Sequence, residues 1–293
     1  MSKRRKASAP AGAPKRQKIR DIFVRRPFAG LVDEPEWVAL RELVPAASAP
    51  LTLTPELAEQ YPDRPVTLAS VLPMAAPAIT KPDGRVMVGL QRHIQSGDVS
   101  RDIAEALLRA LQTPPGGSVS VPALPGEGAR LQDVLADEAL ELTLHDGFEF
   151  WLEPGAADDP TVQASLERAN ASIYPTVRLS AARAAYWCRV ADKGHVRWVL
   201  PDDEDAALEA LARLGTPGDL VLAAGTKFAG MFRAHGLLVP VWDVPRDAEA
   251  TEWEAPLAAF AKRYGEALAD STSLDAAARR AKQGLLGRQL TLR

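Results

Sequence analysis

The chain has 293 residues, of which 46% are hydrophobic and 25% are charged, and its single cysteine is Cys188. This composition is that of a globular protein, and the length suits one large domain or two ordinary ones, of which we expect two. A lone cysteine excludes an intrachain disulfide, a zinc site built on several thiolates and a redox pair, so we expect Cys188 to be a small buried residue.

Membrane segments are not indicated. The longest uncharged run, residues 65–80, is shorter than the ~20 residues that a bilayer requires, and it holds three prolines. The basic start is followed by Ala, Ser, Pro and Gly, where a signal peptide has an apolar stretch. We therefore expect no transmembrane segment and a cytoplasmic protein.

Charge is distributed unevenly along the chain. Residues 1–26 carry ten basic residues against the single acidic Asp21, a net charge of +9, whereas the other 25 basic and 37 acidic residues give 27–293 a net charge of −12. The first segment nearly lacks large apolar residues and so predicts a disordered tail. Its basic residues are Lys3, Arg4, Arg5, Lys6, Lys15, Arg16, Lys18, Arg20, Arg25 and Arg26.

Clustered lysine and arginine attract phosphate polymers by releasing counterions, whatever the base sequence. The tail therefore predicts contact with nucleic acid or the ribosome. An anionic lipid surface and a merely solubilising extension are the alternatives. Aromatic residues appear only at its end, as Phe23 and Phe28, so stacking of bases on the tail is not indicated.

The predicted elements begin with a helix that Asp33 caps and that Pro45 ends. Three units of hairpin followed by helix come next. The hairpins centre on Asp83-Gly84, Asp146-Gly147 and Lys193-Gly194, and the helices follow near 103–111, 162–169 and 207–214. The units around Gly84 and Gly194 are the most similar, and either a duplication or the frequency of such units in α+β proteins explains them.

The polar segment 154–160 contains prolines and a glycine and predicts a linker between an α+β domain at 27–153 and a second at 161–293. The second domain ends in helices over about 248–269 and 274–286. The predicted fold class is α+β, with two similar-sized halves of mixed sheet and helix, a helical C-terminus and a disordered basic N-terminal tail.

Between these parts, residues 219–224, 228–235 and 237–243 predict a strand, a short helix and a strand. A strand ending in Gly225-Thr226-Lys227 before a helix directs backbone N–H groups, a hydroxyl and an ammonium toward one anion. The alternative is that Thr226 merely caps the helix while Gly225 permits close packing. The spacing is not that of a Walker A loop.

Patterns for catalysis or metal binding are missing from the sequence. The histidines, His93, His145, His195 and His235, are too far apart for a metal motif, and neither a G-x-S-x-G nor a G-x-G-x-x-G pattern occurs. We assign no catalytic residue, metal or cofactor. We expect a non-enzymatic adaptor that binds another protein or a small ligand, and the alternative is an anion- or nucleotide-binding enzyme that uses Gly225, Thr226 and Lys227.

Four runs carry a resemblance to a known family: 26–31 (RPFAGL), 37–46 (WVALRELVPA), 224–232 (AGTKFAGMF) and 237–242 (LLVPVW). The chain after the tail resembles an uncharacterised actinobacterial family. That family has no established activity, so the resemblance implies no catalytic residue. Some similar chains are labelled as related to the preprotein translocase motor, which implies an export accessory. This chain differs from that motor in three ways. It has no Walker A loop, it is too short for two motor domains, and it has no Cys/His metal-binding tail.

Overall fold

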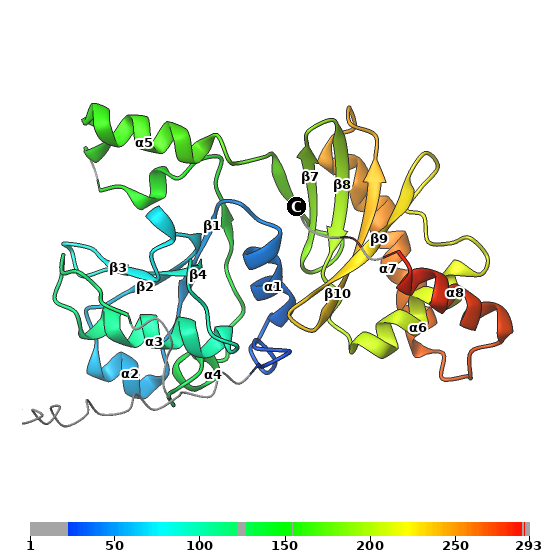
Figure 1. Ribbon diagram of the computed structural model, residues 1–293, viewed down its shortest axis with the longest axis horizontal. Coiled ribbons are helices and arrows are strands. Elements are labelled where there is room, and N and C mark those ends of the chain that lie inside the picture. The colour runs from blue at the N-terminus through cyan, green and yellow to red at the C-terminus, as the bar shows by residue number, and fades with distance from the viewer. Residues whose placement is uncertain (1–22, 122–126, 154, 289, 291–293) are drawn as a thin grey trace, which may run out of the picture.

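Two five-stranded sheets organise the residues that the computed structural model describes, namely 23–121, 127–153, 155–288 and 290. Within them lie eight α-helices and ten strands, which confirms the α+β class. Figure 1 shows one sheet in each half of the molecule, with α1 between them. The predicted tail falls outside the described residues, apart from Phe23 to Arg26.

The first sheet has the strand order β3-β4-β2-β1-β5. Its strands are β1 (Ala47–Leu51), β2 (Val66–Val71), β3 (Ala78–Thr80), β4 (Val86–Gln91) and β5 (Thr143–Leu144). β2 and β4 run parallel, and the other pairs are antiparallel. The hairpin predicted at Asp83-Gly84 is confirmed, since it joins β3 to β4 and Gly84 has a φ of 91°.

The second sheet has the order β6-β7-β8-β10-β9 and is antiparallel throughout. Its strands are β6 (Thr176–Leu179), β7 (Ala185–Val190), β8 (Lys193–Trp198), β9 (Lys227–Ala234) and β10 (Leu237–Val244). Because the first sheet contains a parallel pair and the second has none, the two sheets differ in connectivity. This difference favours independent hairpin–helix units over a duplication.

The helices predicted after the hairpins and at the C-terminus are confirmed. The helices are α1 (Glu34–Glu42), α2 (Pro55–Gln60), α3 (Val99–Gln112), α4 (Leu131–Val134), α5 (Pro160–Asn170), α6 (Glu204–Gly215), α7 (Glu254–Ala269) and α8 (Ala276–Leu286). Short 3₁₀ turns are η1 (Pro73–Ala75), η2 (Glu149–Trp151), η3 (Ala156–Asp158) and η4 (Ala250–Trp253). In Figure 1, α6, α7 and α8 lie on the side of the second sheet that faces away from the first half.

The hairpin predicted at Asp146-Gly147 is wrong, because the chain forms η2 after this turn rather than a strand. The rings of Phe148 and Trp151 stack with their centroids 4.0 Å apart, and Phe150 and Trp151 pack on a small core of the first sheet. Burial of these aromatic rings against the sheet outweighs the local signal for a hairpin.

The hairpin between β7 and β8 exists, but its turn lies at Ala191 and Asp192 rather than at Lys193-Gly194. Ala191 takes the positive φ, 52°. Gly194 is a strand residue, and a Cβ there would come within 2.9 Å of Cγ2 of Val244. Gly194 therefore permits β8 and β10 to pack closely and is not a turn residue.

Asp33 precedes α1 as predicted but does not cap it. Its φ is 60° and its side chain makes no capping hydrogen bond. The carboxylate accepts a hydrogen bond from the N–H of Leu140 at 3.0 Å and one from Nε of Arg183 at 2.9 Å. The side chain of Asp33 therefore bonds to residues far away in the sequence instead of capping α1.

The second sheet is buried on both faces. Along β10, Leu237 and Val239 belong to the core shared with α1 and the first sheet, whereas Leu238 and Trp242 belong to the core beneath α6, α7 and α8. Successive residues of a strand point to opposite faces, so an almost uninterrupted apolar run is expected where both faces are covered.

A fully buried carboxylate ties the two halves together. Glu36 of α1 accepts hydrogen bonds from the N–H of Ala184 at 3.0 Å, the hydroxyl of Tyr186 at 2.6 Å and Nη2 of Arg178 at 2.6 Å. Burial and the nearby charge of Glu36 raise the pKa of Tyr186, which keeps its hydroxyl protonated as a donor. The first half thus supplies the acceptor and the second half its donors.

The chain beyond α8 lies along the outer edge of β9. The N–H of Met231 donates to the carbonyl of Arg288 at 3.3 Å, and the N–H of Leu290 donates to the carbonyl of Met231 at 2.9 Å. Leu290 packs against the core shared by the two halves. These contacts occupy groups that an edge strand otherwise leaves unpaired.

Among the described residues, no helix has the length and apolar character needed to cross a membrane.

Candidate functional site

A pocket of about 490 Å³ opens where β2 and β4 end. Because these strands are parallel, their carboxyl ends meet at one edge, which is where open sheets with parallel strands commonly bind ligands. We call this space the arginine pocket. It is lined by Arg41, Glu42, Ala75, Gln91, Arg92, His93 and Gln95.

Arg41 comes from α1 and is only 6% exposed. Its guanidinium donates to the carbonyl of Leu90 and to the side-chain oxygen of Gln95, and its Nε lies 3.4 Å from Oε1 of Glu42. Burial lowers the pKa of Arg41, although an arginine keeps its charge in proteins. A fixed positive charge therefore lies in the wall of the pocket.

Arg92 follows β4 directly and is 9% exposed. Its Nη1 donates to the carbonyl of Asp102 on α3 at 3.2 Å. The carboxylate of Asp102 accepts from the N–H of Ser96 at 2.7 Å, and burial raises the pKa of Asp102. The loop after β4 and the first turns of α3 thus hold the second arginine in place.

The loop after β2 has a strained backbone beside this pocket. Met74 and Ala75 have φ values of 54° and 48°, in a region that residues other than glycine rarely adopt. Each such residue costs about 1 to 3 kcal/mol, and strain of this kind concentrates at functional sites. The side chain of Met74 is also 91% exposed.

A second pocket, of about 480 Å³, adjoins the first, and Gln95 lines both. We call it the entry pocket, since the N-terminal segment joins the body here. It is lined by Phe23, Val24, Arg25, Gln95, Ser96, Gly97, Val99, Glu204, Arg233, His235 and Gly236. The N–H of Val24 donates to the carbonyl of Gly97 at 2.7 Å, which fixes the start of the described chain to the loop after β4.

A hydrogen bond connects the walls of the two pockets. Nε2 of His235 and Oε1 of Glu42 are 2.8 Å apart. Burial acts to raise the pKa of Glu42, but the hydrogen bond from His235 and the charges of His235 and Arg41 outweigh it and lower that pKa. The negative charge of Glu42 is therefore partly balanced by neighbouring groups of the same site.

The last two basic residues of the predicted tail contact the body. Arg25 pairs with Glu204, and Nε of Arg26 lies 2.6 Å from Oε1 of Glu34. Arg233 lies 2.5 Å from Glu204 on the other side. Glu204, the first residue of α6, thus holds two guanidinium groups in the entry pocket.

The two linings together form what we call the cationic surface. Four arginines and two glutamates line it, whereas residues 27–293 as a whole have a net charge of −12. Sequence reasoning missed this surface because its residues come from separate segments. The available signal was that Arg41 directly follows one apolar run and Arg92 follows another after Gln91, at places where a charged residue needs a partner or a ligand.

The turn at Gly225-Thr226-Lys227 has a different local structure from the predicted one. The strand expected over 219–224 is wrong, since these residues form turns and bends. The helix expected over 228–235 is also wrong, since Lys227 begins β9. The hydroxyl of Thr226 donates to the carbonyl of Ala223 at 2.8 Å and accepts from the N–H groups of Leu222 and Ala223 at 3.1 Å. Anion binding here stays a prediction, and the helix N-terminus on which it was argued is replaced by a strand.

Other chemically suggestive residues form pairs rather than sites. Nε2 of His145 lies 2.8 Å from the hydroxyl of Ser48, and Nδ1 of His195 lies 3.1 Å from Asp243. Burial lowers the pKa of both histidines. Cys188 is buried, as predicted. Within the described ranges, no three His, Cys, Asp or Glu side chains gather closely enough to hold a metal.

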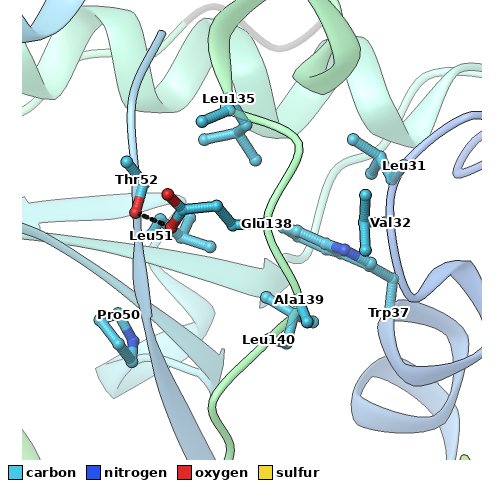
Figure 2. A pocket seen from close by; sticks show the side chains of 11 residues that line it. Leu31, Val32, Trp37, Pro50, Leu51, Thr52, Leu135, Glu138, Ala139 and Leu140 are labelled. Carbon is cyan, nitrogen blue, oxygen red and sulfur yellow. Dashed lines mark hydrogen bonds between the residues drawn. The ribbon is translucent and has the colours of Figure 1, made fainter. Parts of the chain in front are cut away.

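A third cavity lies between the chain before α1 and the segment after α4. Figure 2 shows Glu138 reaching across it to Thr52, with Trp37 on the opposite side. The hydroxyl of Thr52 donates to Oε2 of Glu138 at 2.5 Å. The cavity measures about 30 Å³, which is room for a water or two but not for a larger ligand.

A family model described as a family of unknown function, DUF5926, matches residues 27–293. The chain belongs to this family. The predicted membership of an uncharacterised family is therefore confirmed, and the matched region covers the two sheets, α1 to α8 and most of the cationic surface. No curated protein and no solved structure matches the chain.

Proposed function

We propose that this protein is a cytoplasmic, non-catalytic binding protein for nucleic acid, which it contacts through the cationic surface and the basic residues that precede it. One observation carries the proposal. The N–H of Val24 is bonded to the loop after β4, so the basic segment 1–22 is joined to the body beside the two arginine-lined pockets.

The charge of both parts supports a polyanion as the ligand. Residues 1–22 carry eight lysines and arginines against Asp21, a net charge of +7, while the rest of the chain is acidic. Such a contrast along one chain is typical of proteins whose basic segment attracts phosphates. Contacts of this kind position a phosphate backbone and do not read base sequence.

The proposal predicts strongly salt-dependent binding. For a single-stranded oligonucleotide, the logarithm of the binding constant should fall linearly with the logarithm of the salt concentration, with a slope of about −0.7 per neutralised phosphate. Removal of residues 2–22 should weaken binding and reduce the steepness of the slope by up to about 6 if all eight basic side chains contact phosphates. Fluorescence anisotropy over a salt series measures both.

The arginines of the body provide a matched comparison. Arg233→Ala removes a guanidinium that pairs with Glu204 at 2.5 Å, and Arg109→Ala removes one that pairs with Glu105 at the same distance but outside the two pockets. Only Arg233→Ala should weaken binding of the oligonucleotide. Equal affinity of the full chain and of residues 23–293, or equal effects of the two substitutions, would contradict the proposal.

A further inference from the structure

The two aromatic residues at the end of the basic segment have opposite environments. Phe28 is fully buried and stacks on Trp37 with ring centroids 5.9 Å apart. Phe23 is 80% exposed, although it lines the entry pocket. A large apolar ring that lies at the rim of a pocket and remains open to water has a face available to a ligand.

The surroundings of Phe23 combine an apolar wall with positive charge. Val24 and Val99 contribute apolar surface to the entry pocket, while Arg25 and Arg233 contribute guanidinium groups. Both arginines are paired with Glu204, so they are held in position before any ligand arrives. Aromatic rings beside arginines are the means by which proteins hold unpaired bases and their phosphates.

We infer that the entry pocket accepts one unpaired base of a single-stranded nucleic acid, stacked on Phe23, while Arg25 and Arg233 bind the neighbouring phosphates. This inference rests on the proposed function and specifies its ligand. In a duplex each base is already stacked and paired inside the helix, so the ring of Phe23 favours single strands. The phosphate contacts alone give no such preference.

Charge complementarity selects nucleic acid as the occupant over an apolar peptide. The pocket lies where the +7 segment 1–22 joins the body, and its lining holds two arginines against one glutamate. An apolar peptide would gain nothing from these charges, whereas each phosphate next to a stacked base gains from them.

The test compares four ligands on the full chain at one salt concentration: single-stranded RNA, single-stranded DNA of the same sequence, a duplex and inorganic polyphosphate. Phe23→Ala should lower the affinity for both single strands by about five- to 150-fold, which corresponds to the 1 to 3 kcal/mol of one stacked base. The affinity for polyphosphate should stay unchanged, because it has no base. Phe23→Trp should restore binding, and Val177→Ala, which removes an exposed apolar side chain on β6, should have no effect.

The outcomes separate the two proposals. If Phe23→Ala leaves the affinity for single strands unchanged while the full chain still binds polyphosphate, the stacking inference is overturned and the proposed function stands. If Phe23→Ala weakens polyphosphate as much as RNA, Phe23 acts through the fold and the inference is overturned as well. If the full chain binds none of the four ligands, the proposed function fails.

Discussion

Replacing Glu36 by alanine should lower the free energy of unfolding by about 3 to 5 kcal/mol, the range for removing one partner of a buried ion pair. The substitution leaves the guanidinium of Arg178, the hydroxyl of Tyr186 and the N–H of Ala184 without their acceptor at the seam between the halves. Unpaired buried donors cost far more than the net gain of an average hydrogen bond. Urea denaturation followed by tryptophan fluorescence measures the change.

Glu105→Ala is the matched control for this prediction. Glu105 also pairs with an arginine, Arg109, but on the surface of α3, where such pairs contribute at most about 1 kcal/mol. If Glu36→Ala lowers the free energy of unfolding no more than Glu105→Ala does, Glu36 does not hold the two halves together.

Replacing Gly230 by alanine should cost at least the 1 to 3 kcal/mol of a backbone conformation that suits glycine only. Gly230 has a φ of 145°, and a Cβ there would come within 2.5 Å of the carbonyl oxygen of Arg288. The backbone oxygen cannot rotate away, so the segment after α8 must leave the edge of β9. Its two hydrogen bonds to Met231 and the packing of Leu290 are then lost.

Two measurements identify this effect. Thermal unfolding gives the loss of stability, and limited carboxypeptidase digestion should proceed further into the C-terminus of the variant than into that of the parent chain. Gly265→Ala is the control, because a Cβ at that position in α7 meets no atom within 4 Å and alanine favours the helix by about 0.5 to 1 kcal/mol. Similar stability changes for both substitutions would contradict the role of Gly230.

The sequence predicted elements well where one local signal agreed with burial. α3 and α6 were found from apolar residues at helical spacing, and the hairpin at Gly84 from its Asp-Gly turn between apolar runs. The prediction failed where distant contacts decide. β9 was taken for a helix because a short apolar run has no clear period, and only its pairing with β10 and the segment after α8 makes it a strand.

The candidate site was predicted only in its charge. The basic tail predicted a polyanion as partner, because its lysines and arginines are close together in the sequence. The cationic surface needs α1, the loops after β2 and β4 and the turn before β10 to meet, which no local pattern reports. Arg25 and Arg26 were counted with the tail for the same reason, since their partners Glu204 and Glu34 follow later in the chain.

The central claim is that nucleic acid binds at the cationic surface, and photocrosslinking tests it most directly. The full chain is crosslinked to a single-stranded RNA that carries a photoreactive base, and the modified peptides are located by mass spectrometry. We expect the crosslinks on residues 23–25, 91–97 and 233–236, the segments that supply most of the lining of the two pockets. Crosslinks that avoid these segments and instead gather at Gly225-Thr226-Lys227, or nowhere on the body, would contradict it.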